Sequence, residues 1–333
     1  MLCCHRPFRR RRRARACRDF ARSFAAFGQP LEGALVIQIG IDFGGTKIEA
    51  AALDNAGRYL ARMRVPNPGS YDAAIRDVCA LIGAAEQEAG AAGTIGIGTP
   101  GSASPRTGLM RNANSTYING RSFRQDLEVA LGRDVRMAND ANCLALSEVV
   151  DGAAAGARTV FAVIIGTGVG GGLVVDGQII GGANGIGGEW GHVPLPWMTA
   201  EEYPGPSCWC GHSGCLDMLI SGTGLRKDYA ARTGHTLDGE AIVQAARRGD
   251  ATAVTVLDAY ISRLGRALAM VVNIVDPDVF VLGGGMSNVE EIYPCLPDII
   301  RAHSFGRAWD GRIVPAKWGD SSGVRGAARL WGN

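Results

Sequence analysis

The chain has 333 residues, 47% of them hydrophobic, which is enough for a large core and more than one typical domain. Charged residues interrupt every apolar run before it reaches the length of a membrane span, so we expect a soluble protein without a membrane partner. Nine of the 34 basic and two of the 32 acidic residues lie in residues 1–33, so the rest of the chain has a net charge of −5 and offers no obvious nucleic-acid-binding surface.

Residues 1–34 are rich in arginine and contain no apolar stretch of the kind that a secretory signal needs. We expect a disordered extension here, and a transit peptide or a basic arm is the alternative. Because a secretory signal is lacking, the protein is expected to be cytoplasmic. Its clustered cysteines are then expected to bind metal rather than to form disulfides.

The first part of the body is predicted to contain both strands and helices. Alternating apolar residues and turn sequences predict a meander of three strands, then a helix, then a strand, a polar loop and a short strand that enters a helix. In chain order these segments are 34–42, 47–54, 59–65, 71–90, 94–101 and 135–142.

The strand–glycine–strand arrangement recurs after residue 158. The remaining segments are predicted to be two strands, three helices, a further strand and a last helix that begins at Ser287 with a Ser287–Glu290 capping box. In chain order, those before the last helix are 159–166, 172–180, 216–231, 239–248, 251–274 and 278–284. Alternating strands and helices indicate an α/β protein, and the recurrence suggests two similar lobes.

The first glycine turn reads Asp42-Phe43-Gly44-Gly45-Thr46-Lys47. Glycines let the backbone approach phosphates closely, while the threonine hydroxyl and the lysine charge can bind them. The aspartate, at the end of a strand, could hold a hydrated Mg²⁺ ion. A plain hairpin turn is the alternative, but the flanking Asp and Lys favour phosphate binding.

Two further glycine clusters follow. Residues 166–171 (GTGVGG) satisfy G-x-G-x-x-G, but the β-branched segment after them predicts a strand where a dinucleotide fingerprint requires a helix. We therefore interpret this cluster as a second hairpin that binds phosphate opposite the first. Residues 283–286 (GGGM) lie between a strand and a helix, where they could admit an adenine ring or serve only as a turn.

Asn139-Asp140-Ala141-Asn142 follows a strand and opens a helix. A lone aspartate at such a junction is expected to be an N-cap. Phosphoryl transfer, however, needs a carboxylate that accepts the proton of the attacking hydroxyl. Asp140 is the best candidate for this base between the two phosphate-binding turns.

Three cysteines in residues 208–215 form the pattern C-x-C-G-x-x-G-C, which needs one more ligand to complete a tetrahedral structural Zn²⁺ site. We expect His192 to be that ligand, with His212 as the alternative. His192 has two ring nitrogens, so it could bind zinc with one and a sugar hydroxyl with the other. Glu189 and Asp217 flank this site and could accept further hydroxyl protons.

These motifs together resemble the ROK family (repressors, open reading frames, kinases). The resemblance covers residues 35–333 and rests on D-x-G-G-T-K, G-T-P-G, N-D-A-N, G-T-G-V-G-G-G, E-W-G-H, C-x-C-G-x-x-G-C and V-L-G-G-G. It implies a two-lobed α/β fold of the actin- and hexokinase-like (ribonuclease H-like) ATPase type, with the ligand cleft between the lobes. The lobes are then residues 35–138 and 139–333; the second contains a zinc-binding insertion at 192–215, and its last helix can pack back on the first lobe.

The resemblance further implies a kinase that uses ATP and Mg²⁺ to phosphorylate a sugar at its 6-hydroxyl, and commonly a homodimer. Asp140 is then the catalytic base, and Asp42 holds magnesium through water. The implied zinc ligands are His192, Cys208, Cys210 and Cys215. The implied sugar contacts are Asn114, Asn139, Asp140, Glu189, His192 and Asp217. The implied nucleotide contacts are Gly40, Ile41, Asp42, Phe43, Gly44, Gly45, Thr46, Lys47, Gly166, Thr167, Gly168, Val169, Gly170, Gly171, Gly172, Leu173, Gly284 and Gly285.

Residues 112–120, 191–198 and 319–328 resemble bacterial fructokinases, also described as mannokinases. We therefore expect fructose as the acceptor, with a glucokinase or an N-acetylglucosamine kinase as the alternative. A sugar-sensing regulator is a more distant alternative, because it would need a DNA-binding domain before residue 35, where helix–turn–helix patterning is lacking. The family usually has Glu where this chain has Asp217, and the shorter side chain puts the sugar preference in question.

Overall fold

The computed structural model describes residues 36–332, of which residues 37–332 belong to one compact unit. The Arg-rich extension expected for residues 1–34 lies outside the described residues. Among the helices of residues 36–332, none combines the length and the apolar character needed to cross a membrane.

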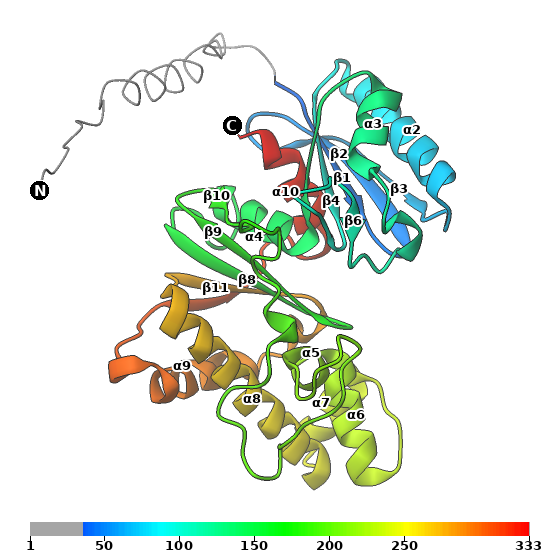
Figure 1. The fold of residues 1–333 in the computed structure, drawn as a ribbon. Coiled ribbons are helices and arrows are strands. Elements are labelled where there is room, and N and C mark those ends of the chain that lie inside the picture. The colour runs from blue at the N-terminus through cyan, green and yellow to red at the C-terminus, as the bar shows by residue number, and fades with distance from the viewer. Residues whose placement is uncertain (1–35, 333) are drawn as a thin grey trace, which may run out of the picture. The chain divides into compact units, whose positions relative to one another are not determined.

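A mixed five-stranded sheet forms the centre of the first lobe (Figure 1). Its order is β3-β2-β1-β4-β7, antiparallel from β3 to β1 and parallel from β1 to β7. The helices α2 and α3 pack their apolar side chains against this sheet. The bounds are β1 (Gln38–Phe43), β2 (Lys47–Leu53), β3 (Tyr59–Pro66), α2 (Tyr71–Ala89), β4 (Thr94–Thr99), α3 (Phe123–Leu131) and β7 (Val135–Asn139), with a small hairpin of β5 (Ser102–Ala103) and β6 (Met110–Arg111) after β4.

A second five-stranded sheet repeats this arrangement. Its order β10-β9-β8-β11-β12 shows the same succession of two antiparallel and two parallel pairings. The two strand–glycine–strand units predicted from the sequence are thus the equivalent hairpins β1–β2 and β8–β9, which confirms the expected fold class. The bounds are β8 (Thr159–Ile165), β9 (Val169–Val175), β10 (Gln178–Ile179), β11 (Val279–Gly283) and β12 (Arg312–Pro315).

Five helices, α5 to α9, gather on one side of the second sheet (Figure 1). The long helix α8 is buried along most of its length, and its Tyr260 and Leu264 join Phe280 of β11 in the core. The bounds are α5 (Leu216–Leu219), α6 (Gly222–Thr233), α7 (Gly239–Arg247), α8 (Ala251–Val275) and α9 (Ile292–His303).

The last predicted helix begins later than expected. A 3₁₀ turn occupies Gly285–Asn288, and the Ser287 hydroxyl donates a hydrogen bond to O of Gly284 at 2.7 Å. α9 begins only at Ile292. The predicted capping box with Glu290 is therefore wrong, because the serine closes the turn after β11 instead of starting a helix.

Two other segments also differ from the sequence prediction. The helix expected at 216–231 is divided into α5 and α6, and Ser221 caps α6 by accepting a hydrogen bond from Gly224 N at 2.9 Å. The segment read as a polar loop contains α3, whose Phe123 is fully buried against the first sheet. α3 is short, so its two buried residues give a weak periodic signal.

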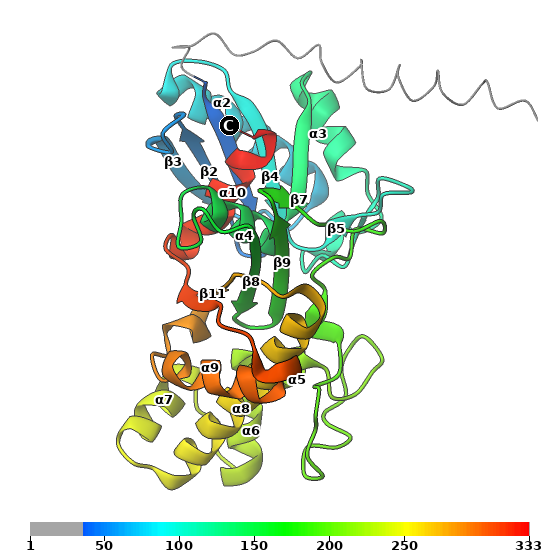
Figure 2. The ribbon, with the colours of Figure 1, turned by 90° about the vertical axis from the view of Figure 1, so that its left-hand side faces the viewer.

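Two helices, α4 (Asp140–Val150) and α10 (Ser322–Ala328), lie between the two sheets (Figure 2). α10 packs on β1 and β4 of the first sheet, α4 packs on β8 and β9 of the second, and the helices pack on each other. Their backbones approach so closely that a Cβ on Gly326 would lie 1.7 Å from O of Cys143. These two helices therefore join the lobes.

We expect Gly326→Ala to lower the free energy of unfolding by about 2–4 kcal/mol, because the added methyl group would meet backbone that has no room to move. Gly83→Ala is the matched control: Gly83 is an exposed residue of α2 with nothing within 4 Å of a built Cβ. It should raise the free energy of unfolding by about 0.5–1 kcal/mol. Equilibrium urea denaturation measures both, and equal stability of the two variants would contradict the close crossing.

Candidate active site

Asp140 lies at the point where β7 ends and α4 begins. Asn139 is the N-cap of this helix: its Oδ1 accepts a hydrogen bond from Ala141 N at 2.9 Å, and its Nδ2 donates to O of Gly101 at 3.2 Å. Asp140 Oδ1 accepts from the same Ala141 N at 2.8 Å. The cap position that the sequence left open for Asp140 is thus occupied by its neighbour.

Carboxylates gather near the start of α4. Burial raises the pKa of Asp140 to about 6, and the negative charge of Glu189 adds to the effect. Burial also raises the pKa of Asp42 to about 7, with contributions from the charges of Asp140 and Glu49. Such pKa values near neutrality suit a group that takes up a proton during a reaction.

The first glycine turn joins β1 to β2. Gly44 N closes this hairpin by donating to O of Lys47 at 3.0 Å, and Thr46 is exposed at its tip. Asp42, at the end of β1, lies next to α10, since a Cβ on Gly323 would be 2.9 Å from its carboxylate. The turn joins two antiparallel strands, as the sequence predicted, and its tip is exposed, so a phosphate can reach it.

The second glycine turn joins β8 to β9, and the strand after it rules out the dinucleotide fingerprint. Gly166 and Thr167 of this turn line a cavity of about 700 Å³. Gly285 and Met286 of the third cluster line the same cavity. The fold therefore brings the second and third glycine clusters together at a space that can hold a small-molecule ligand.

No sequence motif marks α6 and α7 as part of the site, although both line this cavity. Polar side chains at the starts of the two helices are the available signal, but such residues are also common at ordinary helix N-termini. From these two helices, the polar residues that line the cavity are Thr223 and Arg226 of α6, Asp238 and Glu240 at the start of α7, and Gln244 and Arg247 further along α7.

Trp190 fixes the segment that carries Glu189 and His192. It is buried, its Nε1 donates to O of Gly170 at 2.9 Å, and its ring meets that of Phe161 edge-on at 5.5 Å between centroids. The tryptophan thereby attaches this segment to β9 beside the start of α4.

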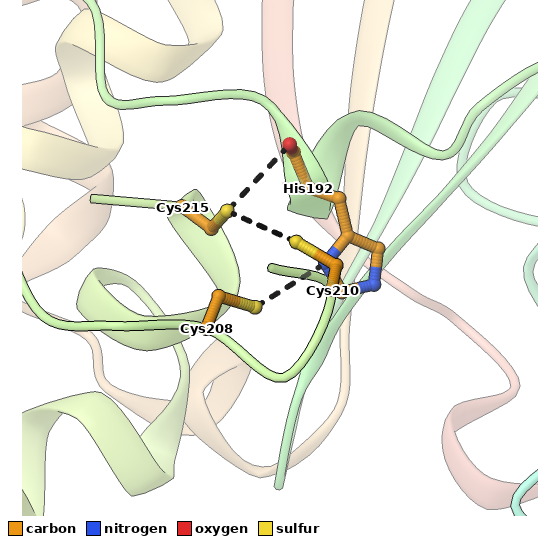
Figure 3. Close-up of side chains that lie close together, drawn as sticks. All are labelled: His192, Cys208, Cys210 and Cys215. Carbon is orange, nitrogen blue, oxygen red and sulfur yellow. Dashed lines mark hydrogen bonds between the residues drawn. The ribbon is translucent and has the colours of Figure 1, made fainter. Parts of the chain in front are cut away.

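His192, Cys208, Cys210 and Cys215 converge (Figure 3). Their ligand atoms all lie within 4.8 Å of one another; His192 Nδ1 is 3.6 Å from Cys208 Sγ, and Cys210 Sγ is 3.6 Å from Cys215 Sγ. In a tetrahedral zinc site with bonds of about 2.3 Å the ligand atoms lie about 3.8 Å apart, so these residues fit a zinc ion. The alternative ligand His212 is exposed and is not part of the group.

Buried ion pairs attach the loop of residues 193–214 to α8. Glu202 pairs with Arg263 at 3.0 Å and with Arg266 at 2.7 Å, and Arg266 also donates to O of Trp197 at 2.6 Å. These ion pairs were not predicted from the sequence, because only the fold places Glu202 beside α8. Two arginines within a largely apolar helix were the signal, since buried charges need partners.

The surroundings of two further expected sugar contacts, Asn114 and Asp217, are also defined by the structure. Asn114 is exposed in the segment between β6 and α3. Asp217 belongs to α5, and its Oδ1 accepts a hydrogen bond from Val169 N at 2.8 Å, at the start of β9. Its carboxylate thus contacts the second glycine turn.

The sequence model of the ROK family matches residues 38–333. The N-acetyl-D-glucosamine kinase of Photobacterium profundum is 41% identical over 296 residues, which cover 87% of this chain and 98% of that protein.

Solved structures agree with the sequence match. The ROK hexokinase from Thermus thermophilus superposes with a TM-score of 0.79 and 33% identity, covering 88% of this chain and 97% of its own. The ROK family glucokinase from Streptomyces griseus, solved in complex with glucose and AMPPNP, has a TM-score of 0.71 and 28% sequence identity. The match covers 88% of this chain and 98% of the glucokinase chain.

We expect the purified protein to carry about one zinc ion per chain and Cys210→Ser to lose it, because a hydroxyl is a much poorer zinc ligand than a thiolate. Cys295→Ser, which changes an exposed cysteine outside the cluster, is the control and should keep the metal. Elemental analysis by mass spectrometry measures the content. Equal zinc in both variants would contradict the assignment of the cluster.

Proposed function

The chain belongs to the ROK family, and on that premise we propose that it is an ATP-dependent sugar kinase that phosphorylates N-acetylglucosamine at its 6-hydroxyl. The observation that carries the proposal is Asp140, a half-buried carboxylate with a raised pKa at the start of α4. It lies near Asp42 at the end of β1, and Ala141 beside it packs against Gly170 of β9. The proposed base therefore lies next to both glycine hairpins.

Asp140 acts as the general base in this proposal. It accepts the proton of the sugar hydroxyl while that oxygen attacks the terminal phosphorus of ATP, and ADP leaves. A pKa of about 6 makes the carboxylate a stronger base than an ordinary aspartate, yet leaves it mostly ionised at pH 7. Asn139 holds the start of α4, so it orients this base.

The two glycine hairpins and the cavity bind the nucleotide. Backbone N–H groups of the turns and the Lys47 charge bind the phosphates, and the cavity between the second glycine turn, α6 and α7 receives the rest of the molecule. Glu49 is paired with Arg62 and Arg64, so Asp42 and Asp140 are the two carboxylates whose charge a divalent cation could neutralise here. Magnesium held there through water by Asp42 would supply positive charge to the phosphates.

N-acetylglucosamine replaces fructose, the acceptor first expected. Several relatives at 37–41% identity over nearly their whole length are N-acetyl-D-glucosamine kinases, and one at 40% identity is the N-acetylgalactosamine kinase of Shewanella sp. (strain ANA-3). The hexokinase and glucokinase structures are less similar, at 33% and 28% identity. The motifs shared with fructokinases were three short segments, so we give the longer likeness more weight.

The histidine and cysteine cluster shapes the acceptor side of the site. Figure 3 shows the His192 ring with Nδ1 toward the thiols and its other nitrogen turned away from them. Zinc bound by the cluster would fix the loop that carries these residues, while Nε2 of His192 remains able to bind a sugar hydroxyl. The cluster thus positions a sugar contact without taking part in phosphoryl transfer.

A coupled ADP-release assay with MgATP tests the proposed acceptor. N-acetylglucosamine should give the highest kcat/KM, ahead of N-acetylgalactosamine, glucose, mannose and fructose. A pocket that bonds the acetamido group is expected to favour its substrate about 100-fold or more over the sugar lacking it. Preference for fructose would restore the first expectation, and lack of turnover with every sugar would support a sensor instead of a kinase.

A pH profile tests the role of Asp140. Since the base must be ionised, kcat/KM should rise with pH up to about 6 and level off above it. Asp140→Asn should lower kcat by about 10²–10⁴-fold while the sugar Kd stays within threefold. Asp134 is an exposed aspartate before β7, and Asp134→Asn should leave both the pH profile and kcat unchanged. More than a tenth of the normal kcat in Asp140→Asn would contradict the assignment.

A further inference from the structure

The corner between α5 and α6 holds the second glycine turn at both of its ends. Asp217 Oδ1 accepts a hydrogen bond from Val169 N at 2.8 Å, at the start of β9. Gly222 N donates to O of Gly166 at 2.7 Å, at the end of β8. Within the turn, Gly166 N donates to O of Gly168 at 3.0 Å. The α5–α6 corner thus makes hydrogen bonds to both ends of the turn, and the Gly166–Gly168 hydrogen bond closes the turn itself.

The Asp217 carboxylate is packed tightly against this turn. A Cβ on Gly168 would lie 2.7 Å from Asp217 Oδ1, so only a glycine leaves room for the carboxylate at this distance. Asp217 is itself fixed, because its main-chain O accepts from the Ser221 hydroxyl at 2.7 Å and that hydroxyl accepts from Gly224 N at 2.9 Å. The side chain therefore has a defined position with respect to the turn.

Loss of this carboxylate would change the turn where a ligand meets it. Gly166 and Thr167 line the cavity, so a shift of their backbone alters the wall of the cavity directly. A hydrogen bond from a backbone N–H to a carboxylate is charge-assisted and stronger than a neutral one. Removing its acceptor leaves the N–H of Val169 without this partner, and the turn loses one of its two external attachments.

We propose that Asp217 is a positioning residue for the turn that binds the nucleotide's phosphates, and not a contact of the sugar. The inference rests on the proposed function, in which this turn binds phosphate. It departs from the sugar contact that the family resemblance implied for this position, where relatives usually have Glu. In this chain the shorter side chain of Asp217 accepts a hydrogen bond from Val169 N, at the start of β9.

Binding measurements without turnover test the inference. The probes are the Mg²⁺ complex of AMPPNP and N-acetylglucosamine, each titrated calorimetrically into the full-length, zinc-loaded protein. Asp217→Ala should raise the Kd for the nucleotide about tenfold and leave the Kd for the sugar within twofold. Asp217→Asn should stay within about threefold for both, because its amide oxygen can still accept from Val169 N. Asp258→Ala removes an exposed carboxylate of α8 and is the matched control.

A second variant approaches the same contact from the other side. Gly168→Ala places a methyl group against the carboxylate and should also raise the nucleotide Kd. In the Asp217→Ala background it should add less than it does alone, because the contact that it disturbs is already lost. If Asp217→Ala folds poorly, Gly168→Ala alone still tests the contact, because it leaves the side chain of Asp217 unchanged.

The outcomes separate the inference from the proposed function. A raised sugar Kd in both Asp217→Ala and Asp217→Asn, with normal nucleotide binding, would make the residue a sugar contact and overturn the inference. Equal nucleotide binding by Asp217→Ala and the unchanged protein would also overturn it, while the kinase proposal stands. Absence of nucleotide binding by the unchanged protein would overturn the proposed function, and the inference with it.

Discussion

The close crossing of α4 and α10 is the contact on which the site depends. The helices follow equivalent strands of the two sheets, yet they pack on each other so closely that Gly326 faces O of Cys143 without room for a side chain. At the far end of α4 the fully buried Glu148 accepts hydrogen bonds from Lys317 N at 3.0 Å and from the Ser322 hydroxyl at 3.0 Å. These bonds tie the end of α4 to the segment that starts α10, so a buried charge that would otherwise be costly has its partners. The two helices therefore behave as one unit between the sheets.

The same helix begins at the proposed catalytic base, so the crossing also places the chemistry. A Cβ on Gly172 would lie 2.3 Å from O of Ala141, which means that the first turn of α4 rests directly on the backbone of β9. Backbone contacts of this kind tolerate little displacement, since interiors are packed like crystals. Asp140 is thereby held at the ends of the strands that carry Asp42 and the second glycine turn. The burial that this arrangement requires also raises the pKa of Asp140 to about 6.

The sequence predicted those parts of the fold that local patterns determine. Alternation and glycine turns located both hairpins, and the strand after Gly171 was enough to reject a dinucleotide fingerprint. The spacing of the cysteines predicted a metal site, and the fold brought His192 to it. What local patterns could not give was contact between distant segments. The sequence predicted Ser287 as a helix cap, whereas in the structure its hydroxyl closes the turn after β11. The partner of Glu202 could not be predicted, because Arg266 is brought beside it only when α8 packs against this loop. The identity of the sugar acceptor could not be predicted from short motifs either, because it depends on the shape of the pocket.

The position of the cysteine cluster links the two halves of the proposed reaction. On one side it contains His192, whose neighbour Trp190 is attached to β9. On the other side it ends at Cys215, which is the N-cap of the short helix that carries Asp217. A loop ordered by this cluster would therefore position both His192, the proposed sugar contact, and Asp217, which is bonded to the second glycine turn. Sugar and nucleotide must meet in line for phosphoryl transfer, so a single rigid loop that positions both contacts reduces the number of independent parts that have to be aligned.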